Sequence, residues 1–121
     1  MKVKIDTKEK FDVLTLQEAI LYANMTDELN QLLLGYLKRD KKNLVLKMEE
    51  VNEIDELVAS SLVNLQQKFY ADNASFVICE IKPAIEKYLD KLNLLEKMNI
   101  TRTESEAWDI VQMEEIEREL M

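Results

Sequence analysis

The chain has 121 residues, of which 47% are hydrophobic and 33% charged, so we expect one globular domain, 1–121, and not a disordered chain. Its net charge of −8 argues against nucleic acid and anionic membranes as partners, because both attract basic surfaces. No apolar run approaches the ~20 residues that span a bilayer. The first residues also lack the apolar core of a signal peptide, so a cytoplasmic location is expected.

The acids concentrate in the later part of the chain. Residues 1–47 carry nine bases against seven acids, whereas residues 48–121 carry seven bases against seventeen acids. Acids of this kind keep a small protein soluble, and this simpler explanation is preferred to a surface that binds a basic partner.

A single cysteine and no histidine restrict the available chemistry. Cys79 cannot form an internal disulfide, and its place in the apolar stretch SFVICEI predicts a buried thiol that fills the core. Without histidine the chain lacks the commonest general base and the usual zinc ligand. A glycine-rich phosphate loop is also absent, so neither an enzyme nor a nucleotide site is indicated. We expect no catalytic residue, no metal and no cofactor.

Two alternating stretches open the chain. Residues 2–6 and 11–17 alternate apolar and polar side chains, which is the period of half-buried strands. The polar segment 7–10 between them predicts a hairpin. Residues 19–24 are expected to form a connecting loop.

From Thr26 the apolar period changes to that of a helix. Its apolar face is expected to consist of Leu29, Leu32, Leu33, Tyr36 and Leu37. Thr26 is the expected N-cap, and Asp27 and Glu28 suit the positive end of the helix dipole. Gly35 lies inside this helix off the apolar face, and close packing against a neighbour is one explanation.

Two strand–helix pairs follow. Residues 43–48 predict a buried strand, and the next helix is expected to begin near Asp55 and to end at Asp72 and Asn73. Its apolar side is expected to hold Val58, Leu62, Leu65 and Phe69. Residues 75–81 predict a central strand, after which Pro83 suits the first turn of a third helix. The inner face of that helix is expected to be Ile85, Tyr88, Leu89 and Leu92.

The chain is expected to close with a short edge strand and a fourth helix. Thr103 and Glu106 have the spacing of a capping box. The apolar side of the last helix is expected to be Ala107, Ile110, Val111, Met113, Ile116 and Leu120. The resulting order, β-β-α-β-α-β-α-β-α, predicts an α/β domain whose sheet is largely parallel after an antiparallel N-terminal hairpin.

Residues 44–62, LVLKMEEVNEIDELVASSL, resemble the central segment of STAS domains, the anti-sigma factor antagonist family. In that family a strand of the type LxLDLSxVxxID leads into Ser-Ser-Gly or Ser-Thr-Gly. Two later stretches, SFVICEIKPAIEKYLDKLNLLEKMNI and TESEAWDIVQMEEIEREL, are similar to the family's following strand and helix and to its C-terminal helix. The resemblance covers nearly the whole chain and implies the same order of elements.

The resemblance also implies a function. In the family an unphosphorylated STAS domain binds an anti-sigma factor kinase, and phosphorylation of the second hydroxyl residue releases it. Here Asp55 matches the family acid, Glu56 the first hydroxyl residue, Leu57 the phosphorylated one and Val58 the glycine. Leu57 cannot be phosphorylated, so the usual switch is expected to be missing. Lys47 replaces an acid that is usual in the preceding strand.

The residues of this segment also have structural interpretations. The expected partner-binding residues are Asp55, Glu56, Leu57, Val58 and Ser61. Asp55 suits an N-cap as well as a partner contact, and Glu56 is a favourable acid for a first helical turn. Leu57 is expected either in an interface or against the first helix. Ser60 and Ser61 are alternative phosphorylation sites, although helical serines are more often packing neighbours.

We therefore expect a non-enzymatic protein-interaction module of the anti-sigma factor antagonist type, monomeric or weakly dimeric. Its partner would be an anti-sigma factor kinase or another STAS protein. The alternative is a structural or dimerising module that pairs with a switch-competent relative, for which the apolar Leu57 and Val58 and the six methionines are the motivation.

Overall fold

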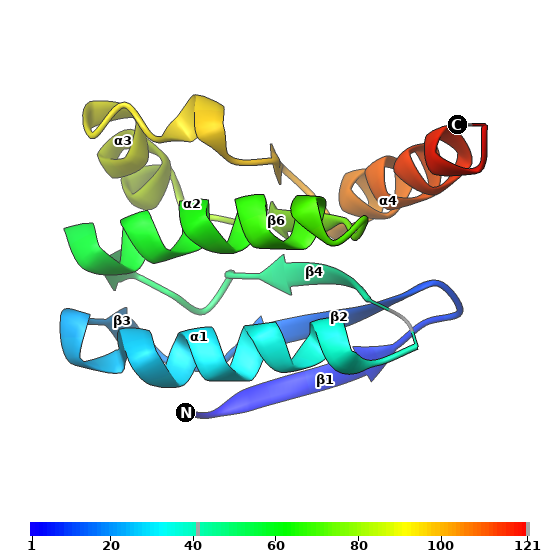
Figure 1. The fold of residues 1–121 in the computed structure, drawn as a ribbon. Coiled ribbons are helices and arrows are strands. Elements are labelled where there is room, and N and C mark those ends of the chain that lie inside the picture. Colours follow the sequence, from blue (N-terminus) through cyan, green and yellow to red (C-terminus); the bar gives the residue numbers. More distant parts are fainter. Residues whose placement is uncertain (41, 121) are drawn as a thin grey trace.

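The computed structural model describes residues 1–40 and 42–120. Its centre is a five-stranded sheet in the order β1-β2-β4-β6-β7 (Figure 1). These strands are β1 (Val3–Thr7), β2 (Phe11–Leu16), β4 (Asn43–Lys47), β6 (Phe76–Cys79) and β7 (Ile100–Thr101). β1 runs antiparallel to β2, and every other neighbouring pair is parallel. The predicted hairpin, the largely parallel sheet and the α/β class are therefore confirmed.

A second, two-stranded sheet lies beside the main one. It pairs β3 (Ile20–Leu21) with β5 (Glu53–Ile54) in parallel, and a 3-10 turn, η1 (Ala23–Met25), follows β3. The prediction of a plain connecting loop over 19–24 is therefore wrong. A strand of two residues is too short to show a clear alternating period, which is why the sequence interpretation missed it.

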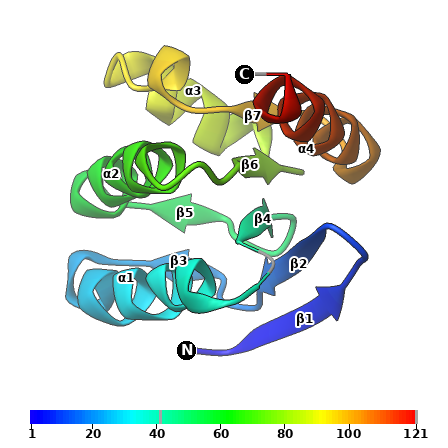
Figure 2. The same cartoon turned by 45° about the vertical axis from the view of Figure 1, so that its right-hand side comes forward.

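Four α-helices pack against the main sheet. α1 (Thr26–Leu34) and α2 (Glu56–Ala71) lie side by side along one face, with α3 (Pro83–Lys91) packed against the same core. α4 (Glu104–Glu119) lies on the opposite face (Figure 2). Two further 3-10 turns are η2 (Gly35–Lys38) and η3 (Leu95–Lys97). None of the helices in the described part of the chain is long and apolar enough to cross a membrane.

The sheet separates two hydrophobic clusters, because successive strand residues point to opposite faces. On β4, Leu44 and Leu46 point into the larger cluster beneath α1, α2 and α3, whereas Val45 points towards α4. The smaller cluster consists of Phe11, Val13, Val45, Val77, Cys79, Ala107 and Val111. The prediction of a buried Cys79 is confirmed, and burial raises the pKa of its thiol to about 12.

Two expectations for the first helix are wrong. Thr26 is the first residue of α1 and not its N-cap, because η1 precedes it without a break; its hydroxyl donates to the Ala23 carbonyl oxygen at 2.8 Å. α1 also ends at Leu34, and Gly35 begins the turn η2. A side chain at Gly35 would meet no atom within 4 Å, so close packing does not explain this glycine.

The start of α4 agrees with the sequence. Thr103 is the N-cap, and its hydroxyl oxygen accepts the Glu106 N–H at 3.2 Å. The Thr103 hydroxyl in turn donates to the Glu106 carboxylate at 3.1 Å. In a full capping box that carboxylate would accept the Thr103 backbone N–H, so only the first half of the predicted box is present among the described residues.

The later half of α4 does not agree. Ala107 and Val111 are buried as expected, but Met113, Ile116 and Leu120 are 58%, 54% and 82% exposed. α4 packs on its face of the sheet by one side only, so residues on its outer side have no neighbour to cover them. The prediction that these three side chains belong to the core is wrong.

Candidate functional site: the start of helix α2

Asp55 fixes where α2 begins. It is the N-cap, and its Oδ1 accepts the Val58 N–H at 3.0 Å. Its Oδ2 accepts a hydrogen bond from the Ala23 N–H, and its own N–H donates to the Leu21 carbonyl oxygen at 3.2 Å. The carboxylate therefore ties the first turn of α2 to η1. Both carboxylate oxygens are engaged within the domain, so the N-cap interpretation of Asp55 is confirmed.

The next three residues differ sharply in exposure. Glu56 is exposed, and the side chain of Leu57 is 59% exposed, whereas Val58 is completely buried. Each helical residue is rotated by about 100° from the last, which turns Val58 into the core. The inclusion of Val58 among partner-contacting side chains is therefore corrected. Ser60 and Ser61, in the next turn, are half-buried.

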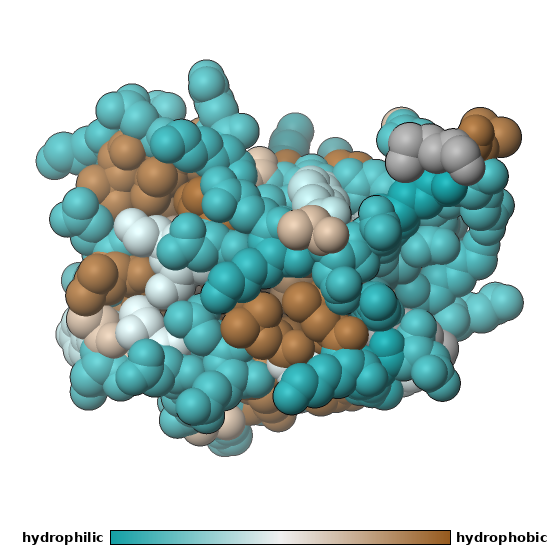
Figure 3. Space-filling view, in the orientation of Figure 1, coloured by the Kyte–Doolittle hydropathy of each residue, from teal (hydrophilic) through white to brown (hydrophobic). Residues whose placement is uncertain are grey.

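Two further exposed apolar side chains lie on the segment that is bonded to Asp55. Ile20 is 37% exposed and Tyr22 is 49% exposed, while Leu21 between them is buried. β3 is attached to the start of α2 through Asp55, so these side chains flank the same helix start. Across the wider face formed by α1 and α2, apolar surface gathers in separate patches within a hydrophilic surround (Figure 3). The sequence interpretation missed Ile20 and Tyr22, because three successive apolar residues in so short a segment show no alternating period.

Two exposed acidic side chains lie at the same end of the molecule. Glu53 is paired in register with Ile20, and both Glu53 and Glu56 are exposed. A hollow of about 340 Å³ opens on the α3 side of Asp55. It is lined by Asn52, Glu53, Ile54, Asp55, Ala84, Ile85 and Tyr88. The site thus combines an exposed leucine, an acidic margin and a shallow hollow.

Lys47 belongs to a different part of the molecule. Its ammonium group forms ion pairs with Glu49 at 3.4 Å and with Glu104 at 3.2 Å, so it is directed towards the start of α4. Burial lowers the pKa of Lys47, but the hydrogen bonds to Glu104 and Glu49 outweigh burial and leave it raised. The lysine is charge-compensated and does not contribute to the surface around Leu57.

The described residues contain no cluster of three or more acids and cysteines arranged to hold a metal ion. The start of α2 presents one exposed apolar side chain, carboxylates and a capped helix terminus.

The sequence matches the STAS domain family over residues 2–107, and the chain belongs to that family. No curated protein matches it. Solved structures at low identity share its fold. An anti-sigma factor antagonist from Mycobacterium paratuberculosis superimposes with a TM-score of 0.78 at 14% identity, covering 92% of this chain and 93% of the other.

Two more solved structures give the same result. RsbS of Moorella thermoacetica, carrying a serine-to-glutamate substitution, has a TM-score of 0.75 at 21% identity, with 93% and 96% coverage. The Bacillus anti-sigma factor antagonist SpoIIAA in its unphosphorylated form has a TM-score of 0.70 at 14% identity, with 92% and 96% coverage. Identities this low establish the common fold alone. The predicted fold and family are confirmed.

Proposed function

We propose that this STAS domain is a regulatory protein-interaction module of the anti-sigma factor antagonist type, and that the exposed start of α2 contacts its partner. We further propose that Leu57 occupies the position of the family's phosphorylated hydroxyl residue, so that the module works without the usual switch. The observation that carries this proposal is the 59% exposure of Leu57 in the first turn of α2.

A hydroxyl residue and a leucine make different kinds of contact at a helix start. A hydroxyl at a helix start can lie inside an interface. Its phosphorylation introduces a charge of about −2, which repels nearby acids and is costly to remove from water. A leucine allows no such change. Burying a leucine side chain in an interface is worth about 1.5–3 kcal/mol, so Leu57 favours a contact that persists.

The proposal assigns no catalytic role to the domain. Cys79, the most nucleophilic type of side chain present, is buried, and burial raises the pKa of its thiol to about 12. The thiolate that could act as a nucleophile is therefore scarce at neutral pH. Regulators of sigma factors act in the cytoplasm, and we propose that location for this domain.

The partner proposal is tested by titrating the domain into a purified anti-sigma factor kinase from the same genome and measuring the heat of binding. Leu57→Asp should weaken binding at least about tenfold, which corresponds to 1.4 kcal/mol, because a charge would have to be buried. Ile116→Asp is the matched control: it makes the same kind of change at an exposed apolar residue on α4. Equal effects of the two substitutions, or none, would contradict the proposed surface.

A second candidate is a structural module that pairs with a switch-competent STAS relative. The exposed Ile20 and Tyr22 favour it, because they lie on the segment bonded to Asp55 and add apolar area at this end of the molecule. Sedimentation velocity discriminates the candidates: a domain that stays monomeric alone and in mixtures with STAS relatives would exclude the pairing module.

A further inference from the structure

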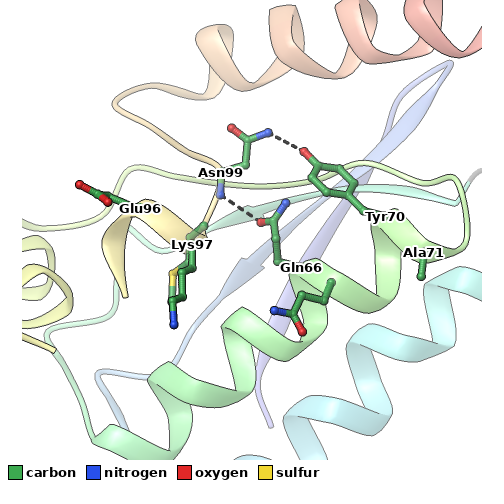
Figure 4. A pocket seen from close by; sticks show the side chains of 8 residues that line it. Gln66, Tyr70, Ala71, Glu96, Lys97 and Asn99 are labelled. Carbon is green, nitrogen blue, oxygen red and sulfur yellow. Dashed lines mark hydrogen bonds between the residues drawn. The ribbon is translucent and has the colours of Figure 1, made fainter. Parts of the chain in front are cut away.

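The two edges of the main sheet differ in length and in what holds them. β7 forms one edge with only two residues. The segment leading into β7 is bonded to α2, because Gln66 Oε1 accepts the Asn99 N–H and the Tyr70 hydroxyl accepts from Asn99 Nδ2 (Figure 4). β1 forms the other edge with five residues, and no described strand pairs with its outer side (Figure 1). Of the two, the β1 edge is the one with the length to receive another strand.

The outer side of β1 presents open backbone groups. At the start of the hairpin, the Gln17 N–H donates to the Lys2 carbonyl oxygen at 2.9 Å. Hydrogen-bonded and non-hydrogen-bonded pairs alternate along an antiparallel ladder, so the even-numbered residues of β1 direct their N–H and C=O groups towards β2. The N–H and C=O groups of Val3, Ile5 and Thr7 therefore point to the open edge, where another strand could pair with them.

The side chains of β1 have a charge pattern that complements itself. Lys4 and Asp6 are exposed and lie on one face of the sheet, since they are two residues apart in a strand. Ile5 is 39% exposed and lies on the other face, beside Leu14 of the larger hydrophobic cluster. When two copies of β1 run antiparallel with Ile5 opposite Ile5, Lys4 of each copy lies opposite Asp6 of the other. Opposite charges in directly facing positions stabilise a pair of strands.

The charges also select this register over its neighbours. A two-fold axis perpendicular to the sheet keeps the matching faces of both copies on the same side. Moving that axis to Lys4 would place two lysines opposite each other, and moving it to Asp6 would place two aspartates opposite each other. Like charges in facing positions are destabilising. With the axis at Ile5, Val3 of each copy lies opposite Thr7 of the other, so the open N–H and C=O groups of all three residues find partners.

We propose that β1 pairs with β1 of a second copy of this chain, antiparallel about a two-fold axis at Ile5, so that the two sheets become one continuous sheet. Asp6 already pairs with Lys8 of its own chain at 3.0 Å, and a carboxylate has acceptor sites for a second cation. A strand of five residues is about 17 Å long and gives a contact smaller than a standard interface, so we expect a weak dimer with a Kd of about 0.1–1 mM. The proposal uses β1 and does not depend on the proposed role of the start of α2.

Sedimentation equilibrium and nuclear magnetic resonance test the pairing in the unmodified domain. Between about 0.05 and 2 mM, a range that brackets the expected Kd, the average mass should rise from that of the monomer towards that of the dimer. In a mixture of isotope-labelled and unlabelled chains, the Lys4 Hα should give an NOE to the Asp6 Hα of the other copy. Facing residues of a non-hydrogen-bonded pair bring their Cα atoms to about 4.5 Å. A strict monomer over this range, or a dimer without this NOE, would overturn the proposal.

Two charge reversals test the register. Lys4→Glu places an acid opposite Asp6, and Asp6→Lys places a lysine opposite Lys4, so each variant alone should self-associate at least about tenfold more weakly. An equimolar mixture of the two should recover the affinity of the unmodified domain, because the acidic strand of one variant then faces the basic strand of the other.

Lys87→Glu and Asp90→Lys are the matched controls. They change the net charge by the same amounts at exposed residues of α3, and their self-association should stay within about twofold of that of the unmodified domain. Equal weakening by the controls, or a mixture of the β1 variants that does not recover, would overturn the register. If a β1 variant does not fold, the NOE in the unmodified domain decides the question alone.

Discussion

The helices α2 and α4 have the same length and similar beginnings, yet they use their apolar residues differently. Each has 16 residues and starts with a side-chain cap, Asp55 in α2 and Thr103 in α4. α2 buries seven residues and α4 buries two. α2 packs against the sheet with α1 and α3 around it, whereas α4 lies alone on the opposite face. An apolar helical period therefore predicts burial only where neighbouring elements cover that face of the helix.

The largest expected effect separates the apolar residues of the two helices. Phe69→Ala in α2 should lower the free energy of unfolding by about 3–5 kcal/mol, because the side chain is completely buried against Phe76. Ile116→Ala in α4 should lower it by less than about 0.5 kcal/mol, since that side chain is exposed. Urea unfolding at neutral pH measures both. Similar losses would mean that α4 has a covered face after all.

The caps should show the next largest effect. Asp55→Ala leaves the N–H groups of Val58 and Ala23 without their partner, and we expect a loss of about 2–3 kcal/mol. Thr103→Ala removes a cap from one helix only and should cost about 1 kcal/mol. Thermal and urea unfolding of both variants provide the measurement. A loss at Asp55 no larger than at Thr103 would show that the link to η1 contributes nothing.

The pH dependence of stability should report how α4 is held at its C-terminal end. The hydrogen bond from Asn43 and the nearby Arg118 lower the pKa of Glu115 below its ordinary value of 4.5, although burial opposes them. Its stabilising effect is therefore fully present above about pH 4.5 and is lost as the pH falls through the lower pKa of the folded state.

Glu115→Gln should accordingly be less stable than the unmodified domain at pH 7, and the difference should shrink in acid. Urea midpoints at several pH values between 7 and 3 measure it. Glu117→Gln, on the same helix away from Asn43, is the control for a change of one charge. A constant difference across this range would contradict the role given to Glu115.

The smallest effect on stability is expected at the proposed contact residue. Leu57→Ala should change the free energy of unfolding by less than about 0.5 kcal/mol, because the side chain is mostly exposed. Val58→Ala should cost more than about 1 kcal/mol, since Val58 is completely buried. Urea unfolding of the pair measures the contrast. A large loss at Leu57 would show that it acts as a core residue.

Most of the fold could be predicted because its signals are strong and local. The buried run of β6, Pro83 at the start of α3 and the cap at Thr103 each specify one kind of element. A strand was also expected at β2, but as a half-buried one, whereas all six of its residues are buried. The failures have a different cause. The short strand β3 is too brief to show a period, and the exposure of Met113 depends on what lies beyond α4.

The sequence could predict where the site lies, but not which of its side chains are exposed or what they contact. The pattern around Asp55 predicted a helix start, and the capping bond to Val58 is present. The sequence interpretation left open whether Leu57 lies outside or against α1, because one helical residue can face either way until neighbouring helices are placed. Ile20 pairs with Glu53, and Gln66 accepts a hydrogen bond from Asn99. The residues of each pair are more than 30 positions apart in the sequence, so local patterns could not predict these contacts.

We propose that Leu57 stands where STAS relatives carry a modifiable hydroxyl. This proposal is tested by incubating the unmodified domain and Leu57→Ser with an anti-sigma factor kinase and ATP and measuring intact masses. We expect no phosphate on the unmodified domain and one phosphate on Leu57→Ser. Stoichiometric phosphate on Ser60 or Ser61 of the unmodified domain, or none on Leu57→Ser, would contradict the account.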